Sequence, residues 1–183
     1  PLTTNSTVVN LTCNATPTHV AFNTATITGS TPGSDSGCGN IPGTPNVTIA
    51  KSNPVIALVA GNQYTATYTL TVGNTGTGTG NYTLSDTPAF PAGIVLDSLN
   101  ATTVGGTLGG GAFPRVSPAN NAPQQISAAG VSIAAAGSHT YTVVITFTTN
   151  SAVVNLTCNA TPNNGAFNTA TITGSTPGSD SGC

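Results

Sequence analysis

Residues 147–183 read FTTNSAVVNLTCNATPNNGAFNTATITGSTPGSDSGC, and residues 2–38 read LTTNSTVVNLTCNATPTHVAFNTATITGSTPGSDSGC. Only five aligned pairs differ: Leu2/Phe147, Thr7/Ala152, Thr18/Asn163, His19/Asn164 and Val20/Gly165. Self-similarity at a fixed spacing is the signature of a repeat architecture. We therefore interpret the chain as a window cut from a tandem array, with one full repeat of about 145 residues preceded by the tail of another.

This repeat divides the 183 residues into three parts. We expect residues 1–38 to be the C-terminal tail of a preceding repeat, or a segment donated to a neighbour. Residues 39–45 contain two prolines and are expected to be a semi-rigid linker. Residues 46–183 would then form one complete domain, which is long enough to bury a single core.

Charged side chains are scarce, since the chain has two basic and four acidic residues and a net charge of -2. So few Lys and Arg residues exclude an electrostatic footprint for nucleic acid. They also exclude the basic cluster that an anionic membrane surface requires. No apolar run is long enough for membrane insertion. A small net charge gives little repulsion between molecules, so copies of the protein itself are expected partners.

The four cysteines form two equivalent pairs, Cys13 with Cys38 and Cys158 with Cys183. No CxxC spacing occurs, and the histidine near the first pair is replaced by asparagine in the second copy. The pattern therefore disfavours a zinc site and predicts a disulfide within each tail. Disulfides indicate an oxidising, extracellular setting. No cluster of oxygen ligands is visible either, so we expect no metal and no cofactor.

Alternation of apolar and polar residues is clearest in residues 63–72, where Tyr64, Ala66, Tyr68, Leu70 and Val72 share one face. Residues 139–149 alternate in the same way, and both runs predict half-buried strands. Shorter strands are predicted at residues 6–12, 21–28, 46–50, 55–60, 81–86, 93–98, 125–127 and 131–134. Residues 31–37 (TPGSDSG) and 105–123 are expected to be loops. Many short strands with no helical period predict an all-β fold, an antiparallel β-sandwich.

Four short motifs occur in order along the chain. They are Tyr-Thr at residues 68–69, Asn-Thr-Gly at 74–76, Asp-Thr-Pro at 86–88 and Asn-Thr-Ala-Thr at 168–171. Together they resemble the Ig-like "conserved repeat domain" (domain of unknown function eleven) of large bacterial surface proteins, over roughly residues 46–173. The chain departs from that pattern after Asp86, where Pro-Ala-Phe-Pro replaces a shorter Leu-Pro. The resemblance implies an Ig-like sandwich, a tandem array in an adhesin, stalk or surface fibre, and no enzymatic activity.

Lys51 is the only lysine and lies at the end of the first predicted strand of the domain, while Asn168 lies in the closing Asn-Thr-Ala-Thr strand and Asp86 lies between them in the sequence. The resemblance implies that such a lysine can condense with such an asparagine, with help from a buried acid, to form an isopeptide bond. Burial would make the amine nucleophilic and would keep the acid protonated, so that it polarises the amide. The alternative is that Lys51 is a surface residue, Asp86 caps a turn and Asn168 binds backbone. Asn23, the counterpart of Asn168, would pair with a lysine of the preceding repeat.

Potential N-glycosylation sites, Asn-x-Ser/Thr, occur at eight positions: Asn5, Asn10, Asn14, Asn46, Asn81, Asn100, Asn155 and Asn159. One interpretation is a glycosylated extracellular fibre. The other is chance, because the chain is rich in Asn, Ser and Thr. His19 and His139 have no evident partners in the sequence and are expected at the surface.

Two functions from different classes follow. The first is a structural repeat of a secreted bacterial surface fibre or filament, stapled by disulfides and joined to neighbouring repeats or subunits. Duplication of the tail favours a continuous chain over separate subunits joined by strand exchange. The alternative is an adhesin module that binds a host surface or glycan through the loop at residues 105–123. An enzyme is not expected, because the sequence shows no nucleophile–histidine pair and no carboxylate dyad.

Overall fold

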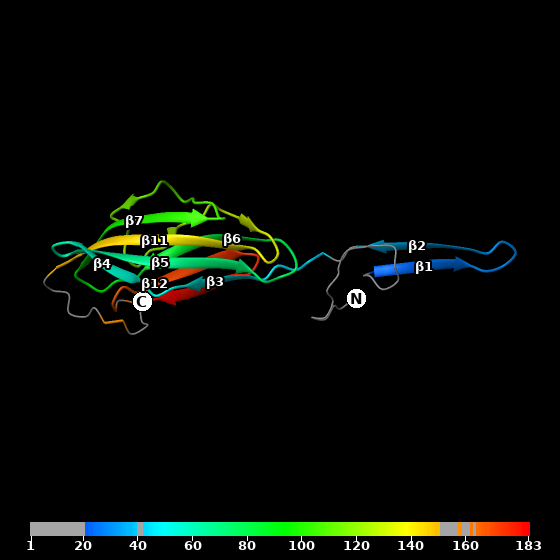
Figure 1. Cartoon of the computed structure of the whole chain (residues 1–183), viewed down its shortest axis with the longest axis horizontal. Coiled ribbons are helices and arrows are strands. Elements are labelled where there is room, and N and C mark those ends of the chain that lie inside the picture. The colour runs from blue at the N-terminus through cyan, green and yellow to red at the C-terminus, as the bar shows by residue number, and fades with distance from the viewer. Residues whose placement is uncertain (1–20, 40–41, 151–156, 159–161, 163) are drawn as a thin grey trace. The chain divides into compact units, whose positions relative to one another are not determined.

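The computed structural model describes residues 21–39, 42–150, 157–158, 162 and 164–183 (Figure 1). It divides the chain into two compact units, Pro1–Gly43 and Thr44–Cys183. The boundary between them falls inside the predicted linker. The described residues form β-strands joined by turns and loops, and the prediction of an all-β fold is confirmed. No helix long and apolar enough to cross a membrane lies among them.

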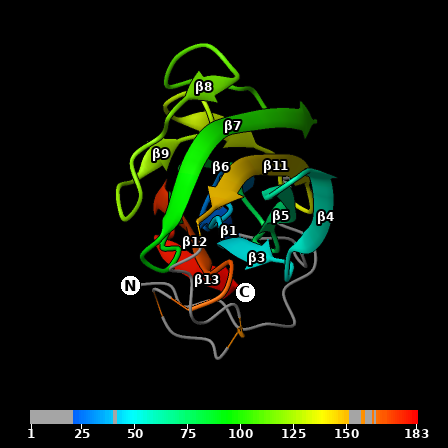
Figure 2. The same ribbon diagram turned by 90° about the vertical axis from the view of Figure 1, so that its left-hand side faces the viewer.

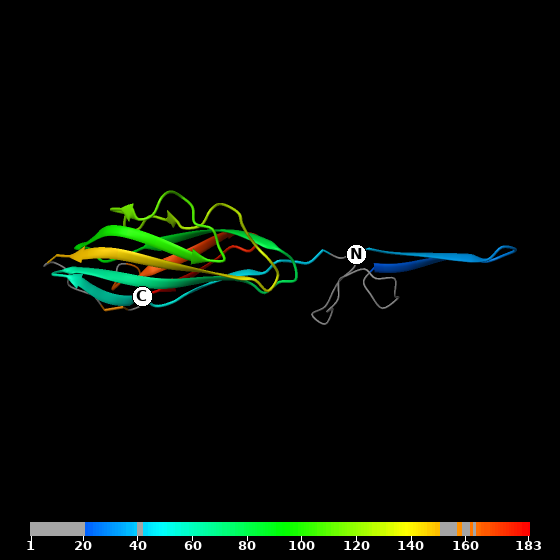
Figure 3. The ribbon, with the colours of Figure 1, turned by 45° about the horizontal axis from the view of Figure 1, so that its top comes forward.

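The larger sheet of the second unit has six strands in the order β3–β5–β11–β7–β8, with β4 also paired to β5. Its pairings are all antiparallel, and Figure 3 shows β5, β11 and β7 side by side. The strands β3 and β4 share one edge because they pair with opposite halves of β5. The six strands are β3 (Val47–Lys51), β4 (Val55–Ala60), β5 (Gln63–Asn74), β7 (Ile94–Val104), β8 (Arg115–Val116) and β11 (Ser138–Thr149).

The second sheet has five strands in the order β10–β6–β12–β13, with β9 also paired to β6. Its pairings are antiparallel as well. Strand β12 lies between β6 and β13, so both of its edges are hydrogen-bonded. The five strands are β6 (Gly80–Pro88), β9 (Gln124–Gln125), β10 (Val131–Ile133), β12 (Asn168–Gly174) and β13 (Gly178–Gly182).

The two sheets pack face to face, as the end-on view of Figure 2 shows, and their inward side chains form one core. The alternation predicted for β5 is observed, because its inward residues from Ala66 to Val72 are fully buried. Aromatic rings join the layers. The rings of Tyr82 on β6 and Tyr141 on β11 meet edge to face at 6.4 Å. This packing is that of an antiparallel β-sandwich.

The sheets also meet along one side of the sandwich, where β3 and β13 lie next to each other. The backbone N–H of Val47 donates to Oγ1 of Thr176 at 2.6 Å. The N–H of Lys51 donates to Oδ2 of Asp180 at 2.7 Å. Contacts advance in the same direction along both segments, so β3 and β13 run parallel. Both hydrogen bonds are accepted by side chains of the β13 segment and not by its backbone. This contact, the seam between β3 and β13, therefore differs from the backbone ladder of a β-sheet.

Two segments predicted to be loops contain strands. The prediction of a loop at residues 31–37 (TPGSDSG) is wrong, because β2 (Gly33–Gly39) pairs with β1 (Ala21–Ile27) in an antiparallel hairpin. Its duplicate forms β13 in the same register against β12. The small residues of these strands carry no apolar alternation, and pairing with the preceding strand determines their conformation. The predicted loop at residues 105–123 likewise includes the two residues of β8.

The Asn-Thr-Gly motif forms the turn after β5 and holds the start of the domain. Asn74 is buried, and its Oδ1 accepts bonds from the N–H groups of Asn46 at 3.0 Å and Gly76 at 3.1 Å. Its Nδ2 donates to the carbonyl of Gly78 at 2.8 Å. A Cβ at Gly76 would lie 2.3 Å from the carbonyl oxygen of Thr44, so glycine is required there. This turn orients the strand that carries Lys51.

Candidate functional site

Three buried polar side chains meet between the two sheets. Nζ of Lys51 lies 2.7 Å from Oδ1 of Asp86. Nδ2 of Asn168 donates to Oδ2 of the same carboxylate at 2.6 Å. The exposed fraction is 0% for Asp86 and Asn168 and 9% for Lys51. Asp86 therefore bridges an amine and a carboxamide at a place that water does not reach.

Strand alternation explains why these three side chains point to one place. Lys51 is the last residue of β3 and occupies an inward position. Asp86 on β6 and Asn168 on β12 are also inward, in neighbouring strands of the other sheet. The β6–β12 register pairs Asn168 with Pro88, two residues beyond Asp86, so the two side chains are diagonal neighbours on one face. The cluster thus links one sheet to the other.

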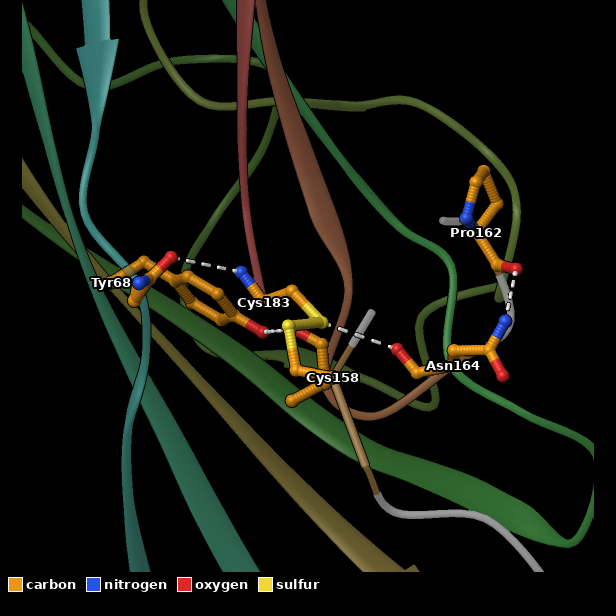
Figure 4. The surroundings of a disulfide bond; sticks show 7 residues. Tyr68, Cys158, Pro162, Asn164 and Cys183 are labelled. Carbon is orange, nitrogen blue, oxygen red and sulfur yellow. Dashed lines mark hydrogen bonds between the residues drawn. A yellow bond between two sulfur atoms is a disulfide. The ribbon is translucent and has the colours of Figure 1, made fainter. Parts of the chain in front are cut away.

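The ring of Tyr68, on β5, forms one wall of the cluster. Nζ of Lys51 lies 4.3 Å from the ring centroid, within the range of a cation–π contact. Burial raises the pKa of Tyr68, so its hydroxyl stays protonated. That hydroxyl donates to the carbonyl of Ala166, two residues before Asn168. Figure 4 shows the same side chain directed toward the disulfide that closes this end of the domain.

Burial also lowers the pKa of Lys51, because the ammonium loses its hydration, while the nearby Asp86 opposes the shift. A lowered pKa increases the share of neutral amine, which is the nucleophilic form. The 2.7 Å hydrogen bond between Lys51 and Asp86 is a direct path for the proton that must leave. Transfer along it would convert a buried ion pair into a neutral amine and a neutral acid.

The Oδ1 atom of Asn168 has no hydrogen-bond partner although it is buried. An unsatisfied buried acceptor of this kind costs about 1–3 kcal/mol. The sequence predicts that a protonated acid polarises the carboxamide, whereas the structure turns the amide nitrogen toward Asp86. A half-turn of the carboxamide would exchange the two atoms. Oδ1 would then accept a bond from protonated Asp86, in the protonation state that condensation requires.

The structure contradicts the simpler alternative for these residues. Lys51 is buried and not on the surface. Asp86 lies within β6 and does not cap a turn. Asn168 donates its side-chain bond to Asp86 and not to backbone. Asn168 also begins the penultimate strand and not the last one, because β13 follows it.

His139 is half-buried and has partners, so the expectation of an isolated surface histidine is wrong. Its Nδ1 lies 2.7 Å from the hydroxyl of Tyr82, which in turn lies 2.8 Å from the hydroxyl of Tyr141. The sequence pattern places these residues on separate strands, and only the packing of the sheets brings them together. His19 lies outside the described residues.

Cys158 and Cys183 form the disulfide that the sequence predicts. It ties the end of β13 to a segment that precedes β12 (Figure 4). Cys38 is also disulfide-bonded. Its expected partner, Cys13, lies outside the described residues.

Three of the potential glycosylation sites, Asn46, Asn81 and Asn100, are exposed. The other five lie outside the described residues: Asn5, Asn10, Asn14, Asn155 and Asn159. Exposure at the surface is a condition for the attachment of a glycan.

The long loop considered as an adhesive surface is bound back onto the domain. Nη2 of Arg115 donates to the carbonyls of Gly110, at 3.1 Å, and Gln125. The guanidinium also covers the ring of Phe113 at 4.6 Å from its centroid. Asn120 exchanges two hydrogen bonds with the backbone of Phe90. Within the described part of the chain, no group of three or more His, Cys, Asp or Glu could hold a metal.

Tyr68 and Asp180 belong to the site but were not predicted from the sequence. Tyr68 belongs to the Tyr-Thr motif, but its alternation is that of an ordinary core residue and does not indicate a contact with Lys51. Asp180 is one of four acidic residues in the chain, and its conservation between the two copies, as Asp35 and Asp180, is the one available signal. Asp180 accepts the backbone N–H of Lys51 and thereby holds the end of β3.

No family model, curated protein or solved structure matches this chain. The features that bear on its function are the buried Lys51–Asp86–Asn168 cluster and the duplicated sequence.

Proposed function

We propose that this chain is a structural repeat of a secreted bacterial surface fibre, with each Ig-like domain locked by an isopeptide bond between Lys51 and Asn168. The observation that carries the proposal is the buried Lys51–Asp86–Asn168 cluster. A covalent bond at this place would join the first strand of the domain to the strand at the centre of the opposite sheet.

The reaction needs only groups that the cluster contains. Lys51 gives a proton to Asp86 and becomes a neutral amine, and its Nζ attacks Cγ of Asn168. Asp86 stabilises the tetrahedral intermediate, gives its proton to Nδ2, which leaves as ammonia, and takes the second proton from Nζ, so that it ends as a neutral acid. One C–N bond forms and one breaks, so the products are the amide and one ammonia. No oxidant, metal or cofactor is required.

The cost of burying two charges favours a chemical role for Lys51 and Asp86 over that of a purely structural ion pair. Burying two charges costs several kcal/mol per ion, and apolar residues of similar size often stabilise a core as well or better. This chain has very few charged side chains, yet its only lysine is buried against an acid. A covalent product explains that placement, because the reaction removes both charges.

The fibre context is supported by the rest of the chain. The tail of the domain is duplicated ahead of a proline-containing linker, as expected of tandem domains. A disulfide between Cys158 and Cys183 favours an extracellular setting. The small net charge, -2, allows neighbouring copies to approach each other.

Intact-mass spectrometry of the full chain after complete reduction tests the proposal. The expected mass is that of the sequence less one ammonia, with a Lys51–Asn168 linkage in the fragment spectrum. Lys51→Met is the control, because cyclisation of an asparagine onto its own backbone also releases ammonia but does not need the lysine. The full sequence mass in the wild-type protein would refute the crosslink.

A further inference from the structure

Among the described residues, the first unit contains a second copy of the hairpin that completes the domain, and this copy pairs with no third strand. Residues 21–38 are identical to residues 166–183. The β1–β2 hairpin pairs Asn23 with Gly37, and the β12–β13 hairpin pairs Asn168 with Gly182, so their registers are the same. One sequence thus forms one hairpin in two different settings.

The settings differ in burial. Ile172 is 0% exposed in the core of the domain, whereas its counterpart Ile27 is 68% exposed. Residues 23–37 of the first hairpin are all exposed. Two strands alone are marginally stable in water, because they have no further strand or layer to bury their apolar face. The β1–β2 hairpin therefore lacks the partner that its sequence is suited to.

The second unit shows what that partner must provide. Strand β12 pairs with β6 along its whole length, and Asn168 reaches Asp86 on that strand. A partner for β1 must therefore present a β6-type edge, with a buried acid and an amine beside it. A preceding copy of this domain, for which residues 21–38 supply the closing hairpin, meets these requirements.

The direction of the chain favours a different copy as the partner. In the complete domain the β13 segment meets the start of β3 at Thr176, while Cys183 donates to Oδ1 of Asn53, beyond the end of β3. A docked hairpin thus releases the chain at the far end of the domain that it completes. To enter the same domain, residues 39–46 would have to run back along the length of β3, whereas in an array they lead directly into the next domain.

We propose that the β1–β2 hairpin is the closing hairpin of a preceding copy of the domain, and that Asn23 forms the amide with that copy's counterpart of Lys51, as Asn168 does with Lys51 in the described domain. This inference rests on the proposed isopeptide, and it adds the partner and the acceptor residue. Each domain is then closed by a hairpin, and the backbone continues from that hairpin through a linker such as residues 39–46 into the next domain. The same hairpin can serve a copy in the same polypeptide or in another molecule.

The test uses the full chain carrying Asn168→Ala and Ile172→Asp, which leave β1–β2 as the only intact closing hairpin. This variant is denatured, refolded at increasing protein concentration and reduced before electrophoresis in SDS. The expected result is a ladder of covalent oligomers that grows with concentration, with Lys51–Asn23 linkages in the fragment spectra. Adding Asn23→Ala is the matched control and should abolish the ladder.

Three results would overturn the proposal. The first is a variant that remains monomeric at full mass, or unfolded at every concentration, while the wild-type protein lacks one ammonia. The second is a Lys51–Asn23 linkage confined to monomers, which would show that the hairpin closes its own chain. The third is wild type at full mass, which refutes the isopeptide itself and this inference with it.

Discussion

Replacing Lys51 with methionine should lower the thermal stability of the domain. The size of the loss follows from the length of the loop between the two crosslinked residues. Methionine keeps an unbranched chain of similar length in the core but cannot form the amide. In wild type, the bond would close a loop from Lys51 to Asn168, which includes most of the domain. The chain-entropy relation for a loop of that length gives about 5 kcal/mol of stabilisation.

That free energy converts to a large shift in the unfolding midpoint. For a domain of this size, about 1 kcal/mol corresponds to about 3 °C, so the midpoint should fall by about 15 °C. Differential scanning calorimetry of both proteins, with disulfides intact, measures the difference. Asp86→Asn provides an independent control, because it retains the lysine and the volume of the side chain but removes the acid. It should have the full sequence mass and a similar loss of stability.

The reasoning would be refuted by a particular combination of results. If wild type lacks one ammonia and Lys51→Met does not, yet the two midpoints differ by less than about 5 °C, the loop-entropy account is wrong. The folded domain would then have to derive its stability almost entirely from packing.

Three further predictions concern packing, the disulfide and pH. Ile172→Ala should destabilise the domain by about 2–5 kcal/mol, and Ile27→Ala, the same change in the exposed copy, by less than about 0.5 kcal/mol; equal effects in denaturant titrations would contradict the burial contrast. Reducing the Cys158–Cys183 disulfide should remove about 3 kcal/mol, because it opens a loop with a sequence separation of 25; an unchanged midpoint would argue against this. Burial lowers the pKa of His139 from the ordinary 6.5, so as the pH falls this histidine is protonated in the unfolded chain before it is protonated in the folded domain. The stability that neutral His139 contributes should therefore be complete above about pH 6.5 and decline as the pH falls further, and a His139→Asn variant with the same pH profile would remove this explanation.

The sequence predicts the fold well where one face of a strand is buried. Strands β5 and β11 were identifiable because every second residue enters the core, which leaves a period of two in the sequence. Strand β13 could not be identified in this way. Its residues, GSDSG, include no large apolar side chain, and it forms because the hairpin with β12 pairs its backbone and the side chain of Asp180 is bonded to β3.

The three polar residues of the candidate site were predictable from the sequence, but their surroundings were not. A single lysine in an almost uncharged chain draws attention, and the family resemblance supplies Asn168 and Asp86 as partners. The roles of Tyr68 and Asp180 depend on contacts between strands far apart in the sequence. No local pattern distinguishes a core tyrosine that covers an amine from one that only packs.

The parallel seam between β3 and β13 has a mechanical consequence for a fibre. Tension applied at Thr44 and Cys183 would pull these two strands in opposite directions along their length, so the bonds at Thr176 and Asp180 would resist in shear and together. With the amide in place, the load would pass from Lys51 directly to Asn168 and bypass all the residues between them. Those residues could otherwise extend by about 400 Å when fully stretched. A crosslinked repeat would therefore transmit force with almost no change in length, while most of its sandwich carries no load.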